Sequence, residues 1–222
     1  MADPIALYTW PELALWLCPL HEVPVAARQA WLDAEEVERA RKFAHDVHRR
    51  RYLAAHVALR ERLAGSLGMA PSALSFASGP HGKPQLAGRA TVQFNLSHSE
   101  DWALVGVGRA GPVGVDIEVL RSVDDALALA RKHYTPNERA ACESAVDVHA
   151  RDRAFLRVWT RKEACLKAVG LGLRLAPSSF EAGPQGARHV ARLATPEGEA
   201  LVEVQSVETG IDAVAAVARR VG

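Results

Sequence analysis

Two acidic residues stand two apart within an apolar stretch, in the segment "GVDIE" that ends at Glu118. Alternate side chains of an extended strand point to the same face, so Asp116 and Glu118 share a face and their apolar neighbours point to the other. Such carboxylates repel each other, and a hard divalent cation such as Mg²⁺, held by carboxylates, water and phosphate oxygens, would offset that repulsion. The structural alternative is an edge strand with a solvated acidic face.

A second charged set lies in "VWTRKEACLKAVGLGL", where Lys162 is followed by Glu163 and Lys167. Trp159, Glu163 and Lys167 are four residues apart and therefore line one side of a helix. Glu163 would complete the carboxylate set of a metal or act as a base, and Lys167 would meet a phosphate. The alternative is a surface ion pair between Glu163 and Lys167, worth about 0.3–0.5 kcal/mol.

Other polar residues suit an anion. Lys83 in the turn "HGKP" is free to reach one, unless it is a plain surface lysine, and Ser97 and His98 follow a strand in "NLSHS". A hydroxyl, an imidazole and backbone N–H groups can together bind a phosphate. The run from Arg49 to Arg51 lies near a helix start, where the dipole disfavours cations, and so indicates either an anionic partner or a solvated turn.

Several common sites are not supported. A Ser97–His98 dyad for acyl transfer is disfavoured because adjacent side chains on extended chain point apart, and no GxSxG elbow is present. The chain also lacks GxxxxGK[ST] and GxGxxG, the loops that bind nucleoside triphosphates and dinucleotides.

The periodicity predicts two long helices, within 45–68 and 151–170, each followed by strands. Strands are expected over 5–10, 91–98, on both sides of 110–112, and over 200–208 and 212–220; a helical stretch breaks at Thr135–Pro136. This order predicts an α/β (α+β) fold of two similar halves, 1–112 and 113–222, although no literal repeat is visible.

Composition narrows the class of protein. The 222 residues include 27 basic and 26 acidic ones, and a net charge of +1 argues against a protein that coats nucleic acid. The three cysteines are far apart and without CxxC spacing, which indicates free thiols in a reducing compartment. Because neither a signal peptide nor an apolar run of about 20 residues is present, we expect a cytoplasmic protein without a membrane partner.

Taken together, "HGKP", "FNLSHS", "GVDIE" and "WTRKEACLKAVGLGL" resemble the 4′-phosphopantetheinyl transferases of the Sfp type in order and approximate spacing. The last element matches the family pattern W-x-x-K-E-A-x-x-K followed by a Gly-x-Gly-Leu turn. The resemblance extends from about Arg51 to about Gly172, most of the chain.

The resemblance implies an enzyme that moves the 4′-phosphopantetheine arm of coenzyme A onto a serine of an acyl or peptidyl carrier protein and releases 3′,5′-ADP. Such carriers serve fatty-acid, polyketide or nonribosomal-peptide synthesis, and Mg²⁺ is required. It implies two α/β halves related by a pseudo-twofold, with coenzyme A in the cleft between them. Such a pseudo-dimeric chain is expected to be a monomer.

The resemblance also assigns residues. It makes Asp116, Glu118 and Glu163 the metal ligands and places Lys167 on the phosphates of coenzyme A. The chemistry of the reaction adds Glu163 as the candidate general base, acting directly or through a metal-bound water. The further coenzyme A contacts it implies are Arg51 (or Arg50 after a register slip), Lys83, Ser97 and His98. This chain departs from some relatives upstream, where Glu36 stands near one of two lysine sites and Arg39 or Lys42 near the other.

Two alternatives have different chemistry: a Mg²⁺-dependent coenzyme A pyrophosphohydrolase and a non-catalytic coenzyme A-binding protein. The residues do not separate Glu163 as base from Glu163 as metal ligand only, nor do they name the preferred carrier or pathway, or decide whether acyl-coenzyme A is accepted. The segment that contains Leu127, Leu129, Arg131 and Lys132 is a candidate docking surface for an acidic carrier, with ordinary helix packing as its alternative.

Overall fold

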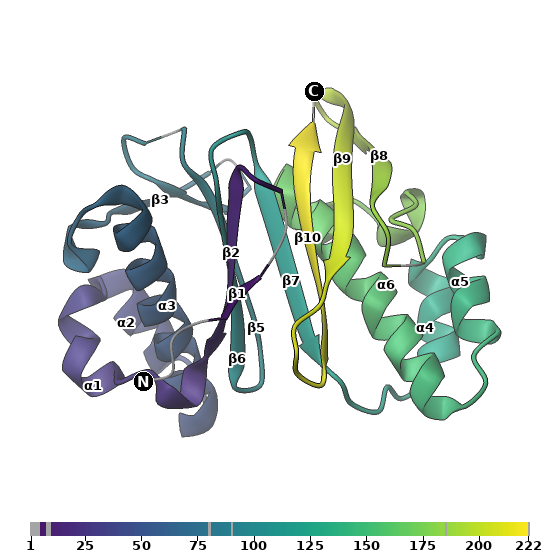
Figure 1. Cartoon of the computed structure of the whole chain (residues 1–222), viewed down its shortest axis with the longest axis horizontal. Helices are drawn as coiled ribbons and strands as arrows, with labels where there is room; N and C mark the ends of the chain where they lie inside the picture. The colour runs from purple at the N-terminus through teal and green to yellow at the C-terminus, as the bar shows by residue number, and fades with distance from the viewer. Residues whose placement is uncertain (1–4, 8–9, 80, 90, 185, 222) are drawn as a thin grey trace.

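Alternating and β-branched apolar segments build two antiparallel four-stranded sheets that stand side by side in the middle of the molecule (Figure 1). The computed structural model describes residues 5–7, 10–79, 81–89, 91–184 and 186–221. Helices cover the outer side of each sheet, α1 to α3 on one and α4 to α6 on the other (Figure 1). The predicted α/β fold with two similar halves is confirmed.

The first half holds one sheet with the strand order β1-β2-β6-β5. Its strands are β1 (Ile5–Leu7), β2 (Leu13–Pro19), β5 (Gln93–Ser99) and β6 (Trp102–Gly108), and β3 (Phe76–Ser78) pairs separately with β4 (Pro84–Leu86). Its helices are α1 (Val25–Arg28), α2 (Ala34–Arg41), α3 (Asp46–Leu67) and the 3₁₀ turns η1 (Leu20–Glu22), η2 (Gln29–Trp31) and η3 (Pro71–Ala73).

The second half holds the other sheet, with the order β7-β10-β9-β8. Its strands are β7 (Val113–Val119), β8 (His189–Thr195), β9 (Gly198–Val207) and β10 (Ala213–Val221). Its helices are α4 (Ala126–His133), α5 (Pro136–Glu143), α6 (Val148–Val169) and the 3₁₀ turns η4 (Gly172–Arg174) and η5 (Pro177–Ser179). No helix among these described residues has the length and apolar character needed to cross a membrane.

Both predicted long helices exist, and α4 and α5 are separated at Thr135 as predicted. The strands β2 and β8 were not predicted. The two strands on either side of 110–112 form as expected, but β6 and β7 belong to different sheets, so their connection passes from one half to the other. The boundary between 112 and 113 stays a prediction. The expected strand over 5–10 forms only at Ile5–Leu7, and residues 8–9 lie outside the described ranges.

The two sheets pack on each other through apolar side chains. Leu15 of β2 and Leu104 of β6 meet Val115, Ile117 and Val217 of the other sheet, and all five are almost fully buried. The apolar face predicted for the "GVDIE" strand is therefore part of the core between the halves. Because this core leaves β7 no room to shift, its opposite face is held in a fixed place.

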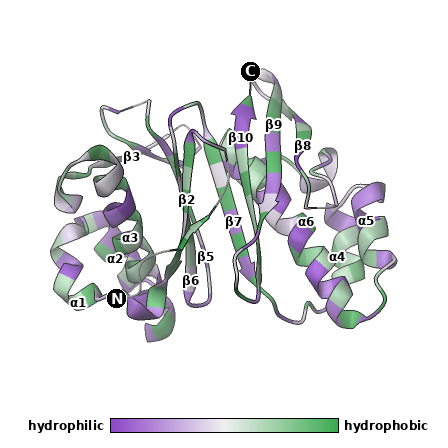
Figure 2. Cartoon of the chain, viewed as in Figure 1, coloured by the Kyte–Doolittle hydropathy of each residue, from purple (hydrophilic) through white to green (hydrophobic). Residues whose placement is uncertain are grey.

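The long helices of the two halves correspond in structure, although their sequences show no literal repeat. Both α3 and α6 have 22 residues and end at a left-handed glycine, Gly68 or Gly170. The fifteenth residue is a fully buried cation in each helix, Arg60 in α3 and Lys162 in α6. Hydrophilic residues interrupt the hydrophobic ones along α6 (Figure 2). Lys162 belongs to this helix and is fully buried in spite of its charge.

The partners of these two cations also correspond. Arg60 donates to Glu36 and to the carbonyl oxygens of Pro71 and Leu74. Lys162 donates to Glu138 at 2.7 Å and to the carbonyl oxygens of Pro177 and Phe180 at 2.7 and 2.6 Å.

In each half the carboxylate belongs to a capping box. Asp33 and Glu36 cap α2, and Thr135 and Glu138 cap α5. The two carbonyl oxygens belong to a 3₁₀ turn and the residue after it. Each half therefore fastens its long helix to a short helix and a turn through one buried cation.

We predict that Lys162→Met lowers the free energy of unfolding by about 3–5 kcal/mol, because it leaves the fully buried Glu138 carboxylate without its cation. Urea denaturation followed by circular dichroism measures the loss. Arg192→Met, which removes an exposed ion pair with Glu199, is the control and should cost about 0–1 kcal/mol. Equal, small losses for both variants would show that the Lys162 pair does not carry the fold.

Candidate active site

The long helix α6 lies directly on β7 because residue 114 has no side chain. A Cβ at Gly114 would collide with the carbonyl oxygen of Ala164 and lie 2.5 Å from the amide nitrogen of Ala168. Only glycine permits this approach. It brings the turn of α6 that carries Glu163 and Lys167 against the strand that carries Asp116.

The closest polar contact of this site joins α6 to β7. The ammonium group of Lys167 donates to Asp116 Oδ1 at 2.6 Å, and it also contacts Ser97 Oγ at 3.1 Å. Asp116 is 5% exposed, so its charge is largely withdrawn from water and depends on this lysine. The surface ion pair between Glu163 and Lys167, the alternative to a functional role, does not form; the salt bridge of Lys167 is made to Asp116 on the strand instead.

The other two acidic residues, Glu118 and Glu163, are partly buried, and both lie close enough to Asp116 for its charge to act on their pKa. Burial raises the pKa of Glu118, and the charge of Asp116 raises it further. Burial likewise raises the pKa of Glu163, with Asp116 and Glu118 adding to the rise and Lys167 opposing it. Glu118 accepts a hydrogen bond from Ser99 Oγ at 3.1 Å. Within the described ranges, the Glu163 carboxylate has neither a hydrogen bond nor an ion pair.

The carboxylates of Asp116, Glu118 and Glu163 are the possible ligands of a divalent cation at this site. No group of three or more His, Cys, Asp and Glu side chains in the described part of the chain is arranged to hold a metal ion. One oxygen of Asp116 is taken by Lys167, but the other, Oδ2, is buried and without a hydrogen-bond partner among those residues. An orphaned carboxylate oxygen beside two further carboxylates is the hard oxygen chemistry that Mg²⁺ prefers. The oxygen donors of Asp116, Glu118 and Glu163 are therefore of the chemical type that binds Mg²⁺.

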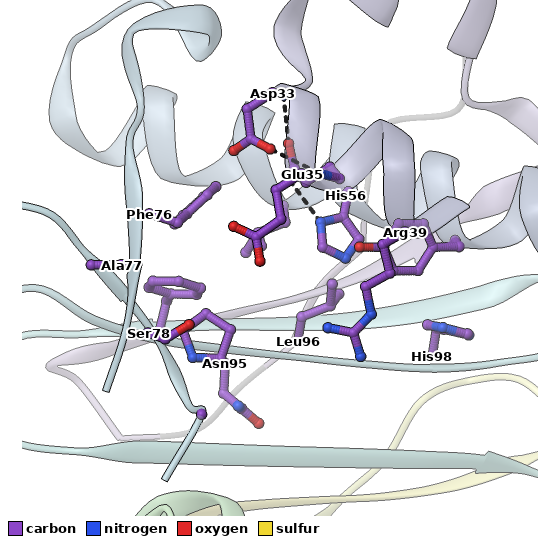
Figure 3. Close-up of a pocket in the computed structure, with 16 residues that line it drawn as sticks. Asp33, Glu35, Arg39, His56, Phe76, Ala77, Ser78, Asn95, Leu96 and His98 are labelled. Carbon is purple, nitrogen blue, oxygen red and sulfur yellow. Dashed lines mark hydrogen bonds and ion pairs between the residues drawn. The ribbon is translucent and has the colours of Figure 1, made fainter. Parts of the chain in front are cut away.

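A cavity of about 280 Å³ opens next to this cluster in the first half. It lies between α2, α3 and β5, and its lining includes Glu35, Arg39, His56, Phe76, Ser78, Gly82, Phe94, Asn95, Leu96 and His98. Figure 3 shows Glu35 and Arg39 extending from α2 into the pocket toward the strand that carries Leu96. The pocket thus combines aromatic walls with acidic and basic groups.

The imidazole groups of the pocket differ in environment. His98 has a lowered pKa because it is buried and because His56, Lys167 and Arg51 are nearby. His56 contacts Glu36 at 2.7 Å and packs on Tyr52. A neutral His98 can still exchange hydrogen bonds with a bound ligand, and it gains a proton more readily when that ligand is anionic.

Two predicted anion-binding residues have protein partners. Lys83 is not free in a turn: its ammonium group donates to the carbonyl oxygens of Val113 and Ala168 at 2.8 and 3.3 Å, and burial lowers its pKa to about 8. That expectation is corrected, because Lys83 ties the "HGKP" loop to the start of β7 and the end of α6. Arg51 makes an ion pair with Glu100 and a bidentate one with Asp101.

Ser97 and His98 lie within β5 rather than after it. Ser97 donates to Asp116 Oδ1 at 2.7 Å, whereas His98 lines the pocket, so the two side chains point apart as expected. Glu36 and Arg39, which stand near the two lysine sites of some relatives, have different surroundings. Glu36 is buried and bonded to Arg60 and His56, while Arg39 lines the pocket.

Some contributors to the site were not predicted. Asn95 and Ser99 contact β7 from the same face of β5 as Ser97. Their signal was the alternation of polar residues in "NLSHS", which is unusual for a strand inside a core. The role of Gly114 was missed as well, because no local pattern shows which element will approach a glycine.

Comparison with known proteins agrees with this arrangement. The family model described as the 4′-phosphopantetheinyl transferase superfamily matches residues 112–217, and that of the 4′-phosphopantetheinyl transferase N-terminal domain matches residues 16–108.

Three relatives cover 73% of the chain each. The 4′-phosphopantetheinyl transferase HetI of Nostoc is 38% identical over 168 residues and 70% of its own length. A putative 4′-phosphopantetheinyl transferase of Synechocystis is 35% identical over 165 residues and 67% of its length. The 4′-phosphopantetheinyl transferase Sfp of Bacillus subtilis is 26% identical over 167 residues and 70% of its length. The chain therefore belongs to the 4′-phosphopantetheinyl transferase superfamily.

Proposed function

We propose that this chain transfers the 4′-phosphopantetheine arm of coenzyme A to a serine of an acyl or peptidyl carrier protein, with Mg²⁺, and releases 3′,5′-ADP. The observation that carries the proposal is the buried contact between Lys167 and Asp116, with Glu118 and Glu163 beside it and a pocket adjoining. The names of the relatives support the same activity.

The three carboxylates of Asp116, Glu118 and Glu163 would hold the metal. Asp116 Oδ2 has a free lone pair for this purpose, and Glu163 is not committed elsewhere in the described ranges. Mg²⁺ bound there would bridge pyrophosphate oxygens and offset the negative charge that repels an incoming nucleophile.

Lys167 would bind the pyrophosphate of coenzyme A. Its side chain is 27% exposed and reaches out from α6, so its ammonium group can turn from Asp116 toward a phosphate. Fixed positive charge beside the leaving phosphate stabilises the charge that develops there as the bond to phosphorus breaks. Lys167 would therefore stabilise the leaving phosphate in addition to forming the ion pair with Asp116.

The serine hydroxyl of the carrier must lose a proton as it attacks the β-phosphorus. Glu163 is our choice for the group that takes it. Its pKa is raised by burial and by Asp116, which makes it a better proton acceptor, and no hydrogen bond within the described ranges occupies its carboxylate. Because a carboxylate cannot freely serve as both tight ligand and base, this role competes with metal binding.

The pocket of the first half would receive the nucleotide end of coenzyme A. Phe76 and Phe94 offer faces for a base, and His98 and Arg39 offer donors to phosphate. Arg51 lies near His98, since it contributes to the lowered pKa of that histidine. Lys83 would form the edge of this pocket through its stem, its ammonium group being bonded to backbone oxygens.

Partners follow from the reaction. The carrier would dock where its serine can reach Glu163, and the exposed Leu129 with Arg131 and Lys132 of α4 suits an acidic protein. We further propose halves divided at 112 and 113, a monomer, a cytoplasmic location and no nucleic-acid partner.

One experiment tests the function. The protein is incubated with coenzyme A, Mg²⁺ and an apo carrier protein, and the carrier is weighed by mass spectrometry. We expect the carrier to gain the mass of phosphopantetheine. Free phosphopantetheine with an unmodified carrier would indicate a pyrophosphohydrolase, and no turnover would indicate a protein that only binds coenzyme A; either result contradicts the proposal.

Asp116→Asn should reduce transfer by more than about 100-fold, since changes around the direct ligands of metal sites already cost about 10–100-fold. The variant keeps the size of the side chain but not its charge. Initial rates across a Mg²⁺ series measure the effect, with Glu199→Gln, on the exposed β8–β9 hairpin, as the matched control. Near-normal transfer at low Mg²⁺ would remove Asp116 from the metal site.

Lys167→Met should lower turnover by about 10²–10³-fold, the usual cost of removing one group that stabilises transition-state charge. Lys167→Arg keeps the charge and should recover part of the rate. Single-turnover kinetics separates this effect from binding of coenzyme A. If Lys167→Met turned over as fast as the unmodified protein, Lys167 would be only the structural partner of Asp116.

A further inference from the structure

The strand β5 presents two different faces to the two parts of the site. Phe94, Leu96 and His98 line the pocket of the first half. The side chains that alternate with them, Asn95, Ser97 and Ser99, contact β7 of the second half, and of these three Asn95 also lines the pocket. One strand therefore touches both the pocket and the strand that carries the acidic residues.

The contacts between β5 and β7 follow a regular order. The backbone N–H of Val115 donates to Asn95 Oδ1 at 2.8 Å. The hydroxyl of Ser99 donates to Glu118 Oε2 at 3.1 Å and accepts from the backbone N–H of Val119 at 3.1 Å. Between these two contacts, Ser97 donates to Asp116. Residue numbers therefore increase in the same direction along β5 and β7, so the two strands run parallel.

These side chains replace a backbone ladder. The strands β5 and β7 belong to different sheets, and each is hydrogen-bonded through its backbone to a strand of its own half. Val115 and Val119 flank the two acidic residues of β7, so the segment is pinned to the first half at both ends. Without these acceptors, the backbone N–H groups of Val115 and Val119 would lose their hydrogen-bond partners on β5, which is unfavourable for a buried donor.

We propose that Ser99, together with Asn95, is a positioning residue that fixes the carboxylate of Glu118, and the β7 segment around it, relative to the pocket of the first half. The inference rests on the proposed function and extends it to Ser99, which lies outside the lining of the nucleotide pocket. Ser99 carries the sharper case, because a single hydroxyl holds both a carboxylate oxygen and the backbone next to it.

The test measures metal binding rather than activity. Mg²⁺ is titrated calorimetrically into the whole protein with coenzyme A bound and no carrier present. Ser99→Ala should weaken Mg²⁺ binding by about 10-fold or more, the usual effect of removing a partner that orients a ligand. The KM for coenzyme A should stay unchanged while kcat falls, because Ser99 does not line the pocket.

Further variants separate positioning from folding. Ser99→Thr retains the hydroxyl and should restore Mg²⁺ binding. Ser99→Cys retains the size but offers a weak donor and acceptor, so it should behave as Ser99→Ala even if the alanine variant folds poorly. Ser179→Ala, which removes an exposed hydroxyl that donates only to the carbonyl oxygen of Ala176, is the matched control.

Normal Mg²⁺ affinity in Ser99→Ala and Ser99→Cys, with or without a loss of thermal stability, would overturn the positioning role and leave a structural hydrogen bond. Failure of Ser99→Thr to recover binding would overturn it as well. Failure of the proposed function is distinct: the unmodified protein would then leave an apo carrier without phosphopantetheine, whatever its affinity for Mg²⁺.

Discussion

The close contact between α6 and β7 at Gly114 is the constraint on which the site depends. No side chain separates the backbone of the helix from that of the strand, and Lys167 therefore reaches Asp116 within 2.6 Å. A helix packed on a sheet through ordinary side chains lies farther away, because those side chains fill the space between the two backbones. At that distance Glu163 and Lys167 would face solvent, and the ion pair on the helix surface would be the better description of this stretch. The absence of a Cβ at Gly114 thus decides whether Lys167 contacts Asp116 on the strand or forms an ion pair on the helix surface.

Holding α6 this close requires support from its other side. Arg161 donates to the carbonyl oxygens of Ala182 and Ala187, and Lys162 to those of Pro177 and Phe180, so two adjacent cations fasten the helix to the chain that follows it. The first half has the same device at Arg60 but not the same chemistry. The sixteenth residue of each long helix is a glutamate. Glu61 of α3 forms an ion pair with Arg28 at 2.9 Å, whereas Glu163 has no such partner among the residues that the structure describes. The twentieth residue is Gly65 in α3 and Lys167 in α6. Both halves share the frame, and the residues proposed for the reaction lie on the long helix of the second half.

The sequence was informative wherever the signal is local. Alternation in "GVDIE" predicted that Asp116 and Glu118 share a face, and their contacts with Ser97 and Ser99 on one neighbouring strand confirm it. Helical spacing predicted both long helices. The repeat stayed hidden because it conserves a buried cation and a capping carboxylate rather than letters: Arg60 corresponds to Lys162, and Asp33 to Thr135. Lys162 and Lys83 could not be distinguished from surface lysines, because their partners are carbonyl oxygens distant in sequence.

The charge balance of the site explains why its parts come from two halves. Three carboxylates, on β7 and α6, face the single ammonium group of Lys167, and Arg121 stands 3.7 Å from Glu118. Burial raises the pKa of Glu118 and Glu163, and the excess of negative charge raises it further. The same excess would push the strand and the helix apart if nothing opposed it. The hydroxyl groups of Ser97 and Ser99 oppose it as neutral donors from β5, which hold carboxylate oxygens without adding a cation that would compete with Mg²⁺. A lysine in their place would neutralise the cluster and occupy its oxygens. Neutral donors from the first half keep the carboxylates oriented and ionisable, as the proposed divalent cation would require if it is to offset their remaining negative charge.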